Sequence, residues 1–125
     1  MTNTPAAPSL TALLQARIAE AERAFVEQMG GATACQLHKD GRVSGSMKYA
    51  EGQFVALCDL RCRLNALSPA PDLTCAQEAL NQEEARWQAA LQHHQGRSAL
   101  SWTAYCQGGV DALRAFREAL TGVRP

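Results

Sequence analysis

Residues 54–67 read FVALCDLRCRLNAL, and this stretch decides the fold class. Its large apolar side chains return every three or four positions, at Phe54, Leu57, Leu60, Leu64 and Leu67. Such spacing places them in one stripe along an α-helix, whereas a half-buried strand would alternate at every second residue. The stretch therefore predicts a helix over about 47–67 whose leucine stripe is buried against other helices.

The same periodicity predicts three further helices, over about 10–29, 73–95 and 99–120. Gly30-Gly31 can end the first helix, and the prolines of the segment 68–71 separate the second from the third. The last two helices are joined around Gly96 and Arg97, so they are expected to be antiparallel neighbours. Gly108-Gly109 lies inside the last helix and predicts either a kink or a close crossing by another helix. The expected class is mainly α, a four-helix arrangement.

A small β-hairpin is predicted over about 34–45, between helices one and two. Asp40-Gly41 is a dipeptide typical of tight hairpin turns, and apolar residues flank it at Cys35, Leu37 and Val43. Two strands alone are marginal in water, so the hairpin would pack on a helix or pair with another chain. Residues 1–9 are expected to form a disordered tail, and residues 10–125 a single helical domain.

Composition narrows the class of protein. Apolar residues make up 46% and charged residues 19% of the 125 residues, which is typical of an ordered globular chain. Twelve basic and twelve acidic side chains cancel, so no overall field favours nucleic acid or an anionic membrane. Residues 1–9 lack the basic and apolar parts of a signal peptide, and the five cysteines are an odd number. We therefore expect a cytoplasmic protein with reduced thiols.

Four thiol and imidazole groups are candidate metal ligands: Cys35, His38, Cys58 and Cys62. These are ligand types that zinc prefers. The second pair, however, has CxxxC spacing inside a helix rather than the usual CxxC. Packing as small apolar side chains is the favoured interpretation, with zinc binding or a thiol switch as alternatives, and no cofactor is predicted.

A second hypothesis places nucleic acid on a basic segment. Residues 31–71 hold five basic side chains against three acidic ones, while residues 72–95 hold four acidic side chains and one arginine. Phosphate contacts would come from Lys39, Arg42, Lys48, Arg61 and Arg63. The favoured alternative is that the basic and acidic segments face one another within the fold or across a dimer.

No catalytic motif supports an enzyme: the chain lacks a GxSxG elbow, a phosphate-binding glycine loop and a Glu-x-x-His pair. The leading hypothesis is a non-enzymatic protein-interaction module that self-associates. An accessory factor of a phage or mobile element, such as an inhibitor docking on a host complex, is one form of it. Glu83 and Glu84 interrupt an apolar stripe and Trp102 lies beside a short loop, so these three residues are the predicted interface.

Overall fold

The computed structural model describes residues 9–30, 36, 44–97 and 99–121. It contains the helices α1 (Leu10–Met29), α3 (Gly45–Leu67), α4 (Leu73–Gly96) and α5 (Leu100–Thr121). The mainly helical class and the four predicted helices are thus confirmed, with bounds that differ by at most two residues. None of these helices is long and apolar enough to cross a membrane.

The predicted β-hairpin falls almost wholly outside the described residues. Of its span, 34–45, only Gln36, Ser44 and Gly45 are described, and none of the three is in a strand. Ser44 instead caps α3, because its Oγ accepts a hydrogen bond of 3.1 Å from the Met47 backbone N–H. Helix α3 therefore begins at Gly45, two residues before the predicted start.

The other helix ends follow the local chemistry of their residues. Ser9 caps α1 by accepting from the Ala12 N–H, and Gly30 ends it with a left-handed φ of 61°. Asp72 caps α4 by accepting from the Cys75 N–H at 2.8 Å. Ser101 does not cap α5, since it is the second residue of that helix.

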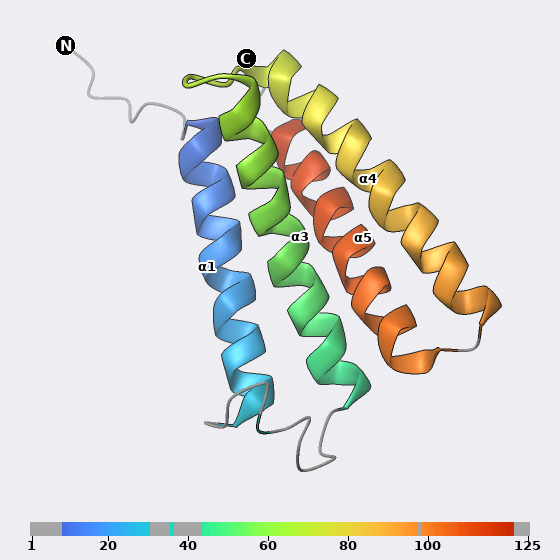
Figure 1. Ribbon diagram of the computed structural model, residues 1–125. Coiled ribbons are helices and arrows are strands. Elements are labelled where there is room, and N and C mark those ends of the chain that lie inside the picture. Colours follow the sequence, from blue (N-terminus) through green and yellow to red (C-terminus); the bar gives the residue numbers. More distant parts are fainter. Residues whose placement is uncertain (1–8, 31–35, 37–43, 98, 122–125) are drawn as a thin grey trace.

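The helices lie in the order α1, α3, α5, α4 across the molecule (Figure 1). The most extensive packing is between α3 and α5, α4 packs mainly on α5, and α1 packs on α3 with little contact to α5. Helix α3 also contacts α4, so α3, α4 and α5 pack against one another and α1 lies on the outer side of α3 (Figure 1). Helices α3 and α5 therefore form the centre of the core, and α1 and α4 are its flanks.

The core lies along the facing sides of α3, α4 and α5, and Leu14, Ile18 and Ala21 of α1 extend it. Phe116, Leu60, Leu80 and Leu113 are completely buried. At one end of the predicted leucine stripe, however, Leu67 is 44% exposed. Leu67 is in the last turn of α3, directly before the extended residue Ser68, so it is exposed where the helix ends.

Glycines set how closely the central helices approach. A Cβ on Gly52 would overlap the Tyr105 carbonyl oxygen, and a Cβ on Gly108 would overlap that of Tyr49. A Cβ on Gly109 would meet the indole of Trp87. The pair Gly108-Gly109 thus marks a close crossing, one of the two alternatives predicted, with α3 on one glycine and α4 on the other.

Candidate functional site

Helix α5 occupies the wedge between α3 and α4, and aromatic side chains of α4 and α5 pack against one another there (Figure 1). Helices α3 and α4 are joined by a short connection and are further apart at their other ends (Figure 1). Toward those other ends, a chain of rings runs along α4 and α5. Ring centroids are 5.2 Å apart for Trp87 and Tyr105, 5.5 Å for Tyr105 and Trp102, and 6.0 Å for Trp102 and His94. His93 extends the chain, 5.2 Å from His94.

Lys48 of α3 packs against two of these rings, those of Trp102 and Tyr105. Its Nζ is 4.8 Å from the centroid of the Trp102 ring and 2.9 Å from Glu51 Oε1, and the residue is 4% exposed. A buried ammonium group is costly unless it is paired, and here a carboxylate and an aromatic face both stabilise it. The local sequence around Lys48 does not predict this role, because the ring that Lys48 contacts is on α5.

Trp102 is 48% exposed even though three helices hold it. His94 of α4 stacks on its ring, Lys48 of α3 lies over it, and Tyr105 of its own helix meets it edge-on. We call Trp102, His93, His94 and Arg97 the Trp102 surface; His93 and Arg97 are also exposed. The Trp102 ring is stacked on the imidazole of His94, next to His93, and the Arg97 backbone N–H donates to the His94 carbonyl at 3.2 Å, so a second imidazole and one cation follow within a helical turn.

Deeper in the wedge, polar groups are held away from water. Trp87 is 4% exposed, and within the described part of the chain its Nε1 has no hydrogen-bond partner. Burial, together with the charges of Glu51 and Asp59, raises the pKa of Tyr105 to about 12. Trp87 and Tyr105 therefore serve packing, and both side chains are uncharged at neutral pH.

Glu83 is buried, and its negative charge is compensated by two arginines. It is 2% exposed, with Arg63 Nε 2.8 Å from Oε1 and Arg86 Nη2 2.8 Å from Oε2. Arg86 also pairs with Asp59, 2.5 Å away. The carboxylate of Glu83 therefore faces Arg63 of the basic segment 31–71 within the fold. It is not accessible to a partner protein.

The other two predicted interface residues are placed differently. Glu84 pairs with Arg117 of α5 at 3.0 Å, with its side chain 27% exposed. Trp102 lies on the surface described above. The structure thus separates the three residues: Glu83 and Glu84 form ion pairs within the fold, and Trp102 stays accessible.

Among the described residues, the predicted phosphate contacts Lys48, Arg61 and Arg63 do not form one basic patch. Lys39 and Arg42 lie outside the described residues. Lys48 is buried, Arg63 is bound to Glu83, and Arg61 Nη1 donates to the Gln15 side chain at 3.0 Å. Among the described candidates, only Arg61 has no carboxylate partner in an ion pair.

Of the candidate metal ligands, Cys35 and His38 lie outside the described residues. Cys58 is half-buried, which raises the pKa of its thiol, while Cys62 is exposed. In the ranges that the structure describes, no three His, Cys, Asp or Glu side chains gather as a metal site. Zinc binding by the four predicted residues stays a prediction.

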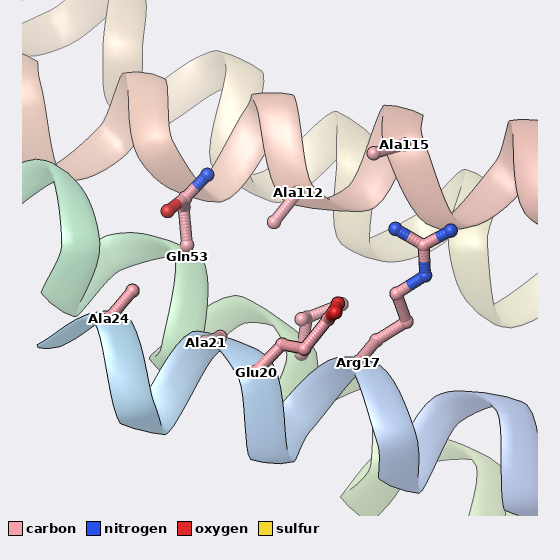
Figure 2. Close-up of a pocket in the computed structure, with 8 residues that line it drawn as sticks. Arg17, Glu20, Ala21, Ala24, Gln53, Ala112 and Ala115 are labelled. Carbon is pink, nitrogen blue, oxygen red and sulfur yellow. The ribbon is translucent and has the colours of Figure 1, made fainter.

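A shallow groove runs between α1 and α5, with α3 as its floor (Figure 2). Ala21 and Ala24 line it from α1, and Ala112 and Ala115 from α5. Its polar rim includes Arg17 and Glu20 of α1. The groove exists because α1 packs on α3 and hardly touches α5.

Comparison of the chain with protein-family models, curated proteins and solved structures finds no match.

Proposed function

We propose that the chain is a protein-interaction module that docks on its partner through the Trp102 surface. The observation that carries this proposal is a tryptophan that is half exposed and yet held in place by groups on three helices. Tryptophan is enriched among residues that dominate binding energy. A ring that is already fixed loses little conformational entropy on binding, so more of its contact energy contributes to affinity.

Self-association is a finer form of the proposal, in which the partner is a second copy. A role as an accessory factor of a phage or mobile element is another. The proposal itself needs only that Trp102 contacts a protein. Size-exclusion light scattering identifies the second-copy case, because a Trp102→Ala variant would then lose its dimer.

The experiment is affinity capture from lysate with three chains: the parent, Trp102→Ala and Leu67→Ala. Leu67 is the matched control, because it is similarly exposed, at 44%, at the end of a different helix. Proteins held by the parent and by Leu67→Ala should be lost from Trp102→Ala. Thermal unfolding by circular dichroism checks that Trp102→Ala is folded, and Trp102→Phe, which keeps a ring over Lys48, should retain part of the binding. Equal capture by all three chains would refute the proposal.

A further inference from the structure

The end of the α4–α5 pair that carries Trp102 has no acidic residue of its own. Residues 85–110 contain no Asp or Glu, and their charged side chains are Arg86 and Arg97, beside His93 and His94. Arg86 is bound to Glu83 and Asp59. Arg97, in the turn after α4, is exposed. This stretch therefore offers a partner one accessible permanent cation and two imidazoles.

The neighbouring helix α3 does not add unpaired negative charge. Its acid at the aromatic cluster is Glu51, and that carboxylate accepts a hydrogen bond of 2.9 Å from Lys48 Nζ. The Lys48 side chain is 5% exposed, so a partner does not touch it. The Lys48–Glu51 pair is neutral as a whole, and the charge that remains at the Trp102 surface is the positive charge of Arg97.

We propose that the Trp102 surface binds an acidic peptide segment with an apolar anchor residue. This inference rests on the proposed function and names the chemistry of the partner. The apolar side chain packs on the exposed part of the Trp102 ring. A carboxylate of the segment pairs with Arg97, whose guanidinium can donate two parallel hydrogen bonds, and a second carboxylate accepts from His93.

Charge complementarity favours a peptide over a nucleic acid. A single strand would also stack on tryptophan, but its affinity depends on several cations along the phosphate backbone. At the Trp102 surface the accessible permanent cation is Arg97, and Lys48 is buried. One cation is sufficient for a carboxylate and insufficient to follow a phosphate chain.

The first test selects peptides from a random displayed library on the full chain, with Trp102→Ala as the counter-selection. We expect Trp102-dependent peptides enriched in Asp and Glu around one large apolar residue. Trp102-dependent peptides without an acidic bias would overturn this inference and leave the proposed function standing. If no peptide depends on Trp102, this inference fails, and the capture experiment with Trp102→Ala and Leu67→Ala decides the proposed function separately.

The second test measures the affinity of a selected acidic peptide for charge-reversal variants. Arg97→Glu should weaken binding about tenfold, the change expected when an attractive charge pair becomes repulsive. Arg23→Glu is the matched control, because Arg23 is exposed on α1 and its reversal changes the net charge equally. An equal loss in both variants would overturn the inference, as would a Trp102-dependent gel shift of oligothymidylate tighter than peptide binding.

Discussion

Glu83 is a charged residue at a core position, and its cost is offset by two arginines. Burial alone raises the pKa of its carboxyl, but hydrogen bonds from Arg63 and Arg86 outweigh burial and lower it. We expect Glu83→Ala to reduce the free energy of unfolding by about 2–3 kcal/mol, measured by urea denaturation. Loss of one partner of a fully buried pair costs about 3–5 kcal/mol, and here both arginines can reach water.

Glu84 supplies the control for this prediction. It is the next residue on the same helix and also pairs with an arginine, but its side chain is 27% exposed. Glu84→Ala should therefore cost less than about 1 kcal/mol. Because the pKa of Glu83 is lowered by folding, its contribution is present above the ordinary glutamate pKa and is lost as pH falls through the lower value. Equal costs for the two variants at neutral pH would contradict the account of Glu83.

At the scale of helix pairs, Gly108 makes a specific prediction about the crossing of α3 and α5. Alanine is usually the better helix former, by about 1 kcal/mol. At this site, however, the added Cβ would overlap the backbone carbonyl of Tyr49, which cannot move without shifting α3. Gly108→Ala should therefore lower the melting temperature, since overpacking typically costs about 1–3 kcal/mol.

Gly96, in the last turn of α4, is the matched helical glycine. A Cβ there would meet nothing within 4 Å. Gly96→Ala should leave the melting temperature unchanged or raise it slightly. If Gly108→Ala were as stable as Gly96→Ala, the close crossing would be wrong.

The sequence predicted where the helices lie better than it predicted which residues of other helices pack against them. Periodic apolar residues and the stops at Gly30 and the prolines depend on local chemistry, so they can be interpreted without knowing the fold. The pair Gly108-Gly109 predicted either a kink or a close crossing, and only the structure shows that Tyr49 and Trp87 lie against these glycines. Leu67 follows the periodicity yet is exposed, because periodicity does not say how far a partner helix extends.

At the scale of the whole molecule, the candidate site depends on contacts between distant parts of the chain. Trp102 could be selected from the sequence as a large aromatic residue beside a loop. The burial of Lys48 against the Trp102 ring could not be predicted from the sequence, because that contact follows from the packing of α3 on α5. The ion pairs of Glu83 with Arg63 of α3 and of Glu84 with Arg117 of α5 could not be predicted either, because they depend on the same packing of distant helices.

Alkaline pH should destabilise the packing of the helices through two half-buried tyrosines, Tyr49 and Tyr105. The Tyr49 hydroxyl donates to Asp111 Oδ2 at 2.5 Å, joining α3 to α5, and burial together with this bond raises the pKa of Tyr49 to about 12. The pKa of Tyr105 is also raised to about 12. A group whose pKa is higher in the folded state stabilises folding fully below its unfolded pKa, about 10 for tyrosine. That stabilisation is lost as pH rises toward 12.

The urea midpoint of the parent chain should therefore fall steeply between about pH 10 and pH 12. Thiols whose pKa values are raised by burial, those of Cys58 and Cys106, add to the same loss. Tyr49→Phe removes one titrating group while keeping the ring, so its midpoint should start lower at neutral pH and fall less over this interval. Circular dichroism of the helical signal measures both curves. Parallel curves for the parent and Tyr49→Phe would show that the Tyr49–Asp111 bond does not couple α3 to α5, because the ionisation of Tyr49 would then be equally easy in the folded and unfolded chains.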